Sequence, residues 1–374
     1  MRQRSCGSAP PSATPPPEPL LLEGIRVVEF ATLIAGPFCG LTLNDLGADV
    51  VKLEPPRGDE GRAFRPFAPD GESAFFHALN RGKRSAVVDA AEARRLAERA
   101  DVVIENAPDR LAFGPADMPE RLVWCSITGQ GPGRGRAMDP SLQATMGLME
   151  LTGERDGPPL RVPVPLIDFM TGMYAAQSVL AALWQAERSG TGAHLDCALL
   201  DSAATLTSTV ALFSLSGEFE PSRIGTESYL RVPSAVFRAA DGEHVQVIAL
   251  HEGHWEALCS ALGRPEWVDD PQSAGNDARL ANRELVNDRI AGVIATAPAD
   301  TWVERINAAG GMCERLRGLG DAWRDPLLAD RGLVGELDGG PFDYPLPVIS
   351  LARPSELVPG PKLGQHTAEV LGEL

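Results

Sequence analysis

One carboxylate stands between a proline-containing extended stretch and an apolar helical pattern. The stretch reads VPVPLIDFMTG, residues 162–172, and the carboxylate is Asp168. An aspartate at such a junction can cap the helix by accepting hydrogen bonds from its unpaired first amides. It can also act as a nucleophile at the carboxyl edge of a sheet, where α/β proteins bind their ligands. The local pattern leaves both roles open.

Local groups of basic residues are the second feature with chemical potential, because the chain as a whole is acidic. Its formal net charge is −17 at pH 7, and such a charge disfavours binding to nucleic acid. A phosphate-bearing ligand must then be held by a local basic cluster. The candidates are Lys83 and Arg84 in NRGKRS and Arg57 in EPPRGD. The same side chains are also compatible with solvated loops.

The histidines and cysteines argue against a metal centre. None of the 6 histidines forms an HExxH pattern, and none of the 6 cysteines forms a CxxC pair. His251 and His254 are close in sequence, but such a pair at a strand-to-helix junction is more typical of a capping or surface position. We therefore expect no metal, no permanently bound cofactor, and the reduced thiols of a cytoplasmic protein.

Two successive strand–helix–strand patterns position these groups in the N-terminal half. The first, IRVVEFATLIAGPFCGLTLNDLGADVVKLE, joins a strand at residues 25–30 to a strand at residues 48–54. The second is RSAVVDAAEARRLAERADVVIEN, and RLVWCSITGQG adds a further strand. This alternation predicts a parallel sheet with helices on both faces. We expect a Rossmann-like half.

The C-terminal half begins with two apolar helical segments and then changes character. The helices are expected from about residue 169 to Gly190 and over residues 195–215. The stretch RVPSAVFRAADGEHVQVIAL then predicts two strands joined at Asp241-Gly242, a strong hairpin signal. Helical patterns such as HWEALCSALG follow it. These features predict a smaller α+β domain.

A chain of 374 residues favours two globular units. We expect a disordered tail at residues 1–20, a large domain at 21–200 and a linker region at 201–225. A small domain at 226–310 and a return segment at 311–374, which completes the large domain, follow. No uninterrupted apolar run approaches the roughly 20 residues of a spanning helix, so we expect no membrane partner.

Taken together, these stretches resemble class III CoA-transferases, the CaiB/BaiF type. The matching motifs stand in the family's order: the first strand–helix–strand unit with EPPRGD, then NRGKRSAVVD, ADVVIEN, DPSLQATMGLMELTGERDGPP, SGTGAHLDCALLDS and PKLGQHTAEVL. The resemblance covers about residues 22–374. It implies an α/β fold with a Rossmann-like large domain and a smaller α+β domain, an interlocked homodimer, and Asp168 as the catalytic nucleophile.

The implied reaction moves CoA between two organic acids. The Asp168 carboxylate attacks an acyl-CoA thioester to give a mixed anhydride and CoA thiolate, which returns to form an aspartyl thioester. The partners are then an acyl-CoA and a carboxylic acid acceptor, with coenzyme A entering as a substrate. By resemblance, the residues that line the CoA site are Leu33, Val88, Asn106, Arg110, Ala137, Met138 and Asp139. For the nucleotide phosphates we add Arg57, Lys83 and Arg84.

Departures from the family pattern bear on the substrate. Ile34 stands where formyl-CoA transferases carry glutamine, which disfavours formate or oxalate chemistry. Met138 stands where the related α-methylacyl-CoA racemases carry a histidine that transfers a proton. A racemase or epimerase is the alternative if His251 or Glu252 reaches the site. An intramolecular CoA-transfer isomerase and a catalytically silent acyl-CoA-binding protein also stay open, and the acyl group is not specified.

Overall fold

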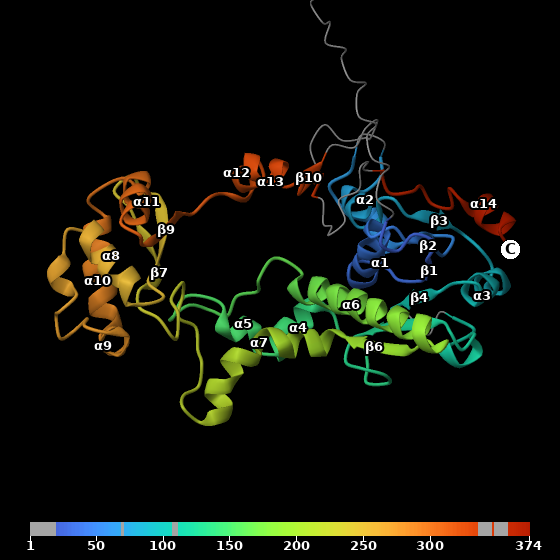
Figure 1. The fold of residues 1–374 in the computed structure, drawn as a ribbon, viewed down its shortest axis with the longest axis horizontal. Helices are drawn as coiled ribbons and strands as arrows, with labels where there is room; N and C mark the ends of the chain where they lie inside the picture. Colours follow the sequence, from blue (N-terminus) through green and yellow to red (C-terminus); the bar gives the residue numbers. More distant parts are fainter. Residues whose placement is uncertain (1–19, 69–70, 107–110, 336–345, 348–357) are drawn as a thin grey trace, which may run out of the picture. The chain divides into compact units, whose positions relative to one another are not determined.

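The structure, a computed structural model, describes residues 20–68, 71–106, 111–335, 346–347 and 358–374. Arg110 and the expected tail, apart from its last residue, lie outside the described residues. The chain divides into two compact units (Figure 1): Met1–Ile127, Gly172–Cys197 and Gly335–Leu374 form the first, and Thr128–Thr171 and Ala198–Val334 the second. This division differs from the expected domains chiefly in two stretches, residues 128–171 and 311–334, both of which belong to the second unit rather than to the large domain.

A six-stranded sheet forms the centre of the first unit, with strand order β3-β2-β1-β4-β5-β6. Its strands are β1 (Arg26–Glu29), β2 (Asp49–Leu53), β3 (Arg84–Ala86), β4 (Val102–Glu105), β5 (Val123–Thr128) and β6 (His194–Ala198). β1 pairs in parallel with β2 and β4, and parallel pairing extends to β3 and β5. Rossmann-like nucleotide-binding sheets have this order. The predicted fold class is confirmed.

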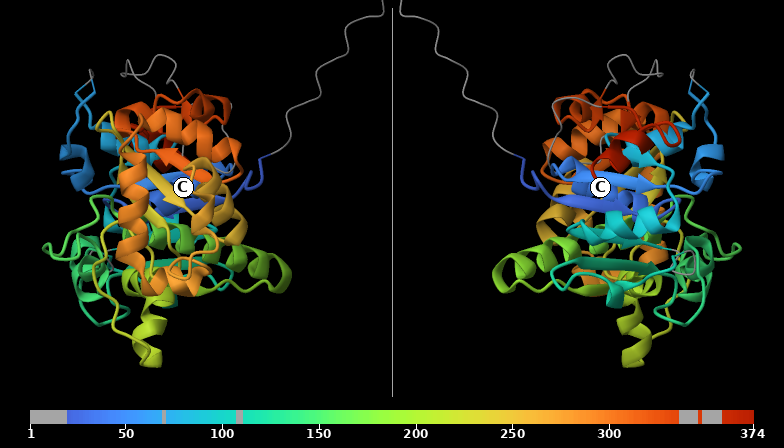
Figure 2. Two further views of the ribbon diagram at one scale, coloured as in Figure 1. Left: turned by 90° about the vertical axis from the view of Figure 1, so that its left-hand side faces the viewer. Right: turned by 90° about the vertical axis from the view of Figure 1, so that its right-hand side faces the viewer.

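The inner strands β1, β2 and β4 carry buried apolar residues on both faces. Val27, Val50 and Val103 are each at most 1% exposed, and strands of this kind need helices over both faces. The helices of the unit are α1 (Ala35–Asp45), α2 (Ala74–Asn80), α3 (Ala90–Glu98), most of α6 (Leu166–Ser189) and α14 (Thr367–Gly372), with 3-10 turns at Glu60–Ala63 and Pro115–Asp117. The C-terminal helix lies beside β3, in red next to the strands in Figure 2.

The second unit contains a three-stranded antiparallel sheet of order β7-β8-β9. β7 (Ser234–Arg238) and β8 (His244–Ile248) form the predicted hairpin. The third strand, β9 (Met312–Arg315), was not predicted and lies beyond residue 310. Trp255, Ile290 and Trp302 belong to the core beneath this sheet and are at most 2% exposed.

Short helices make up most of the remaining second unit. They are α4 (Asp139–Thr145), α5 (Leu148–Leu151), α8 (Glu252–Ala261), α9 (Asn276–Ala281), α10 (Arg283–Ile294), α11 (Ala299–Ala308), α12 (Leu319–Ala322) and α13 (Pro326–Asp330), with a 3-10 turn at Pro265–Trp267. The short strands β10 (Val334–Gly335) and β11 (Leu346–Pro347) follow along the chain, and β11 belongs to the first unit.

The two predicted apolar helices are α6 and α7 (Leu199–Ser216), but residues 195–198, which were expected in the second helix, belong to strand β6. α6 begins in the second unit and ends in the first. Within the first unit, a Cβ added to Gly172 would lie 2.6 Å from the Ala35 carbonyl oxygen, so the close approach requires glycine. By length and composition alone, both helices could cross a membrane, although core helices of soluble proteins pass the same test. The absence of a membrane partner stays a prediction.

Candidate active site

The switch point of the six-stranded sheet lies between β1 and β4, outside whose carboxyl ends such sheets bind ligands. The loop after β1 and the residue after β4 are joined there. The Asn106 side chain accepts a hydrogen bond from the Thr32 N–H at 3.1 Å and donates one to the Thr32 carbonyl at 2.9 Å. Asn106 and Leu33, two of the expected CoA-site residues, therefore lie at this edge.

Leu33 has an uncommon backbone conformation. Its φ is 69°, and no other non-glycine residue in the described part of the chain has a positive φ. A leucine in this region is strained and must be held by its surroundings. Its N–H donates to Asp59 Oδ1 at 3.3 Å, and the same oxygen accepts from the Gly61 N–H at 2.8 Å. A buried carboxylate thus holds the first βα turn.

A buried ion network connects this turn to the strands. Lys52 Nζ lies 2.8 Å from Glu29 Oε1 and 2.9 Å from Asp59 Oδ2. It also donates to the Ala31 carbonyl at 2.6 Å. Burial acts to lower the pKa of Lys52, but the Glu29 and Asp59 carboxylates hold it well above its ordinary value. Sequence reasoning missed these residues, although a charged residue inside an apolar strand, as in IRVVEF and ADVVKLE, was their signal.

Lys83 belongs to the same network and is 3% exposed. Its Nζ donates to Glu29 Oε2 at 2.8 Å, to the Pro37 carbonyl at 2.8 Å and to Asn80 Oδ1 at 3.0 Å. These bonds use all three donors of an ammonium group. Burial lowers the pKa of Lys83 to about 8, against the raising effect of Glu29. Lys83 therefore has no N–H donor left for a phosphate, and its burial does not support the predicted role in binding the CoA phosphates.

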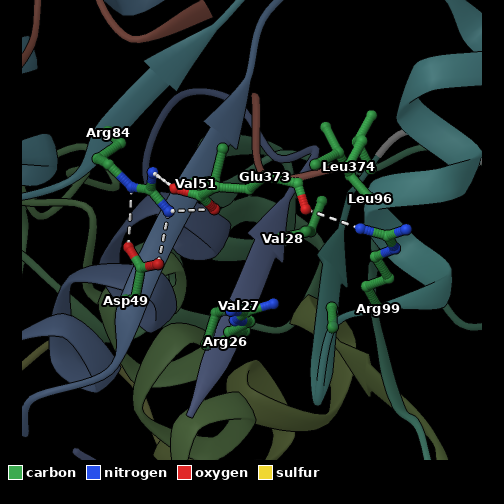
Figure 3. Close-up of a pocket in the computed structure, with 11 residues that line it drawn as sticks. Arg26, Val27, Val28, Asp49, Val51, Arg84, Leu96, Arg99, Glu373 and Leu374 are labelled. Atoms are coloured by element: carbon green, nitrogen blue, oxygen red, sulfur yellow. Dashed lines mark hydrogen bonds and ion pairs between the residues drawn. The ribbon is translucent and has the colours of Figure 1, made fainter. Parts of the chain in front are cut away.

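Arg84 lies at the opposite edge of the sheet, where the strands begin. Its guanidinium pairs with Asp49 at 2.5 Å, Glu369 at 3.0 Å and Glu373 at 2.6 Å. Figure 3 shows the Asp49 and Glu373 contacts at the rim of a pocket that α3 and the C-terminal residues also line. Ion pairs within the chain therefore occupy Arg84, at the edge away from the switch point. These contacts do not support the predicted role of Arg84 in binding the CoA phosphates either.

Arg57 and Val88 lie on the loops that follow β2 and β3, at the same edge as Leu33 and Asn106. Arg57 is exposed, and its guanidinium forms no ion pair with the described residues. Val88 is half-buried and contacts the core beside α3. The carboxyl ends of the parallel strands thus bring four expected CoA-site residues to one edge, and Arg57 is a cation available to a phosphate.

In the second unit, Asp168 is the third residue of α6. It is half-buried, and its side chain accepts no hydrogen bond from the described residues. Burial, and then the charge of Asp139, raise the pKa of Asp168 to about 7. The structure does not give Asp168 the capping role that its sequence position suggested. A poorly solvated carboxylate without donors is available for nucleophilic attack.

Asp139 caps the helix instead. Its Oδ2 accepts from the Ile167 N–H at 2.8 Å, and its Oδ1 accepts from Gln143 Nε2 at 2.7 Å. At 2% exposed, Asp139 is a buried carboxylate with both oxygens bonded. The sequence predicted that Asp139 lines the CoA site, but it did not predict the contact between Asp139 and α6. Asp139 and Ile167 are 28 positions apart, so no local sequence pattern revealed this contact.

Ala137 and Met138 immediately precede α4. Ala137 is half-buried, and its backbone nitrogen would lie 2.2 Å from a Cβ on Gly129. Met138 is 63% exposed, and its N–H donates to Ser141 Oγ at 3.0 Å. A thioether cannot transfer a proton, so Met138 does not replace the histidine of a racemase.

His251 and Glu252, at the start of α8, have partners within the second unit. His251 Nδ1 accepts from the His254 N–H at 3.3 Å, and the two rings lie 3.7 Å apart between centroids. Glu252 pairs with the buried Arg279 at 2.8 Å, and this hydrogen-bonded pair lowers the pKa of Glu252. Among the residues that the structure describes, no group of three or more His, Cys, Asp or Glu side chains is arranged to hold a metal.

The model of CoA-transferase family III matches residues 22–367. The chain belongs to this family. It is 37% identical to a succinate–glutarate CoA-transferase of Agrobacterium fabrum, with 97% of each chain covered. It is 36% identical to a succinyl-CoA:mesaconate CoA-transferase of Haloarcula hispanica, with 94% of this chain and 96% of that protein covered.

The fold agrees with this assignment. A crystal structure of a CaiB/BaiF family protein from Brucella suis superposes with a TM-score of 0.80 at 32% identity. The match covers 94% of this chain and 98% of that one. The family inferred from the sequence motifs is confirmed, and the protein is a class III CoA-transferase.

Proposed function

We propose that this transferase moves CoA from a succinyl-CoA-type thioester to a small dicarboxylate through a covalent intermediate on Asp168. Two relatives that match nearly the whole chain are named for such acids, one for mesaconate and one for succinate and glutarate. The observation that carries the mechanism is the half-buried Asp168 carboxylate, which accepts no hydrogen bond from the described residues.

Each step of the proposed reaction exchanges an acyl bond without water. An Asp168 oxygen attacks the thioester carbon, the carbon–sulfur bond breaks, and CoA leaves as a thiolate. The thiolate attacks the aspartyl carbon of the mixed anhydride, which releases the donor acid and leaves CoA on Asp168. The acceptor carboxylate attacks this thioester, and the released thiolate then attacks the acyl carbon of the acceptor. This last step forms the product thioester and restores Asp168.

The surroundings of Asp168 suit this chemistry. Its raised pKa, about 7, reflects burial first and the charge of Asp139 second. A carboxylate that is weakly solvated loses little hydration when it attacks, and a site with little water protects an anhydride from hydrolysis. Above pH 7 the group is ionised and able to react.

We further propose that CoA binds at the switch point of the six-stranded sheet. The turn at Leu33 and the side chain of Asn106 are held together there through Thr32. Arg57 supplies a cation without a partner among the described residues, and Val88 supplies apolar surface. Roles for Arg110, Ala137 and Met138 rest on the family resemblance alone.

A homodimer, interlocked as the resemblance implies, is part of this proposal. Leu212 and Leu215 on α7 are 63% and 82% exposed. Large apolar side chains on a long helix favour burial against another surface, and symmetric dimers are the commonest way to provide one. A cytoplasmic location likewise stays a proposal.

An acceptor panel tests the proposed substrates. Purified enzyme is incubated with succinyl-CoA and mesaconate, glutarate, oxalate, formate or acetate, and new CoA esters are measured by mass spectrometry. We expect turnover with the larger dicarboxylates and little with formate or acetate. Deuterium incorporation at the α-carbon of an acyl-CoA without CoA exchange indicates a racemase instead. Binding of CoA esters without turnover of any acid indicates a silent binding protein.

A further inference from the structure

We propose that Asp139 is a positioning residue for the reaction: its buried carboxylate, which no cation among the described residues pairs, anchors the first turn of α6 and places a negative charge beside Asp168. The inference rests on the proposed role of Asp168 as the nucleophile. It adds a residue that acts through the nucleophile rather than on the substrate.

The geometry ties α4 to the segment that leads to the nucleophile. Asp139 Oδ2 accepts from the Ile167 N–H at 2.8 Å, one residue before Asp168. Gln143, fully buried one turn further along α4, donates to Asp139 Oδ1 at 2.7 Å. Gln143 also accepts from the Val162 N–H at 3.0 Å and donates to the Val162 carbonyl at 3.2 Å. Two side chains of α4 therefore fix both ends of residues 162–167.

The charge arrangement around Asp139 is uncommon. Among the described residues, no cation pairs with this buried carboxylate, and its charge is balanced only by hydrogen-bond donors. Buried carboxylates are ordinarily paired with a cation or a metal. The negative charge of Asp139 therefore acts on its surroundings with little compensation. This charge disfavours ionisation of the neighbouring Asp168 carboxyl.

The other titratable groups near α4 do not offset this effect. Asp139 is the charged group that acts on Asp168 within the described residues. On α7, which packs against α4, Asp201 is exposed to solvent. On α5, Glu150 pairs with Arg223. The pKa of Asp168, about 7 through burial and then through Asp139, agrees with the geometry.

Two neutral substitutions separate charge from shape. Asp139→Asn keeps the size of the side chain and an oxygen for the Ile167 N–H, but removes the charge. Asp139→Ser also retains a capping oxygen and serves if the asparagine variant does not fold. Gln143→Leu is the matched control, because it breaks the same network while the Asp139 charge stays in place.

The experiment measures the ionisation of Asp168 in two independent ways. The first is the pH profile of CoA transfer. The second is the rate at which a water-soluble carbodiimide modifies Asp168 between pH 5 and 9, read from the peptide mass, because this reagent needs the protonated carboxyl. We expect both midpoints to fall by about one pH unit in Asp139→Asn or Asp139→Ser. Both should stay near the wild-type value in Gln143→Leu.

The two readouts keep this inference distinct from the proposed function. Modification midpoints that are the same in wild type and in the folded neutral variants overturn the role of Asp139. A midpoint that falls equally in Gln143→Leu also overturns it, because loss of geometry alone then explains the effect. If the midpoint shifts as expected but wild type transfers no CoA at any pH, the proposed function has failed and the electrostatic relationship stands.

Discussion

The backbone N–H of Leu33 donates to Asp59 Oδ1 across 3.3 Å, and through this contact a buried ion network holds a leucine at a φ of 69°. The strained turn lies outside the carboxyl end of β1, where we place CoA. Backbone strain of this kind persists only where the surroundings enforce it, and it gathers at binding sites. Asp59 is therefore expected to matter for CoA binding without touching the reacting atoms.

Asp59→Asn tests this role. The amide cannot form the ion pair with Lys52, so the Leu33 turn loses part of its anchor. We expect KM for the acyl-CoA to rise about tenfold with a smaller change in kcat, because the turn binds rather than reacts. The free energy of unfolding should fall by about 1–3 kcal/mol in urea titrations. Asp270→Asn, at a surface ion pair of the second unit, is the control. A folded variant with unchanged KM would refute the role.

Arg57→Ala and Arg84→Ala form a matched pair. Arg57 is exposed at the proposed CoA edge, whereas three carboxylates at the other edge hold Arg84. We expect Arg57→Ala to raise KM for CoA esters about five- to tenfold at low salt, and less at high salt because exposed charges are screened. Arg84→Ala should leave KM unchanged and lower stability by about 1 kcal/mol or less. Steady-state kinetics at two ionic strengths check both, and the reverse ranking would contradict the site.

The raised pKa of Asp168 predicts how stability depends on pH. A carboxyl whose folded-state pKa exceeds its unfolded value binds more protons when folded, so the protein loses stability as pH rises from about 4 to about 7. Asp168→Asn removes the ionisable carboxyl and with it this pH-dependent loss of stability. The variant should be more stable than wild type by about 1–3 kcal/mol at pH 8 and nearly equal at pH 4, measured by urea unfolding. A variant that is less stable at pH 8 would restore the capping role to Asp168.

The exposed leucines of α7 predict that this helix binds a second copy of the chain in a dimer. Replacing Leu212 and Leu215 together by lysine should weaken the dimer, because charged side chains cannot be buried there without partners. Light scattering coupled to size-exclusion chromatography at micromolar concentration measures the mass. Leu21→Lys, at an exposed leucine of the first unit, should leave the mass unchanged. A wild-type protein that is monomeric at that concentration would overturn the dimer.

The elements that the sequence predicted best have strong local signals. Valine-rich runs separated by helical patterns gave the parallel sheet, and the Asp241-Gly242 turn gave the β7–β8 hairpin. β9 was missed because its four residues, MCER, are half polar, show no alternating apolar pattern, and only Cys313 among them is buried. Its strand conformation depends on pairing with β8, which lies far away in sequence.

For the candidate site too, the sequence revealed features with a local motif and missed those that depend on long-range contacts. Asp168 stands out through its motif, but its relation to Asp139 depends on a contact between helices. In sequence, Lys83, Arg84 and Arg57 are equally plausible phosphate ligands. Only their burial and their hydrogen-bond and ion-pair partners in the structure distinguish them. Lys83 enters the core because Glu29 is already buried there, and Arg84 meets carboxylates from the C-terminal helix. Pairings between residues far apart in the chain cannot be recognised from a short stretch of sequence.

The most direct test of the account is CoA transfer by Asp168→Asn, with the covalent intermediate sought in the wild type. The amide keeps the shape of the side chain but cannot attack a thioester, so we expect transfer to fall by several orders of magnitude while CoA binding persists. Wild type incubated with succinyl-CoA and treated with hydroxylamine should carry a mass change on the peptide that contains Asp168, and the variant should carry none. Substantial transfer by Asp168→Asn, once deamidation back to aspartate is excluded, would contradict the mechanism.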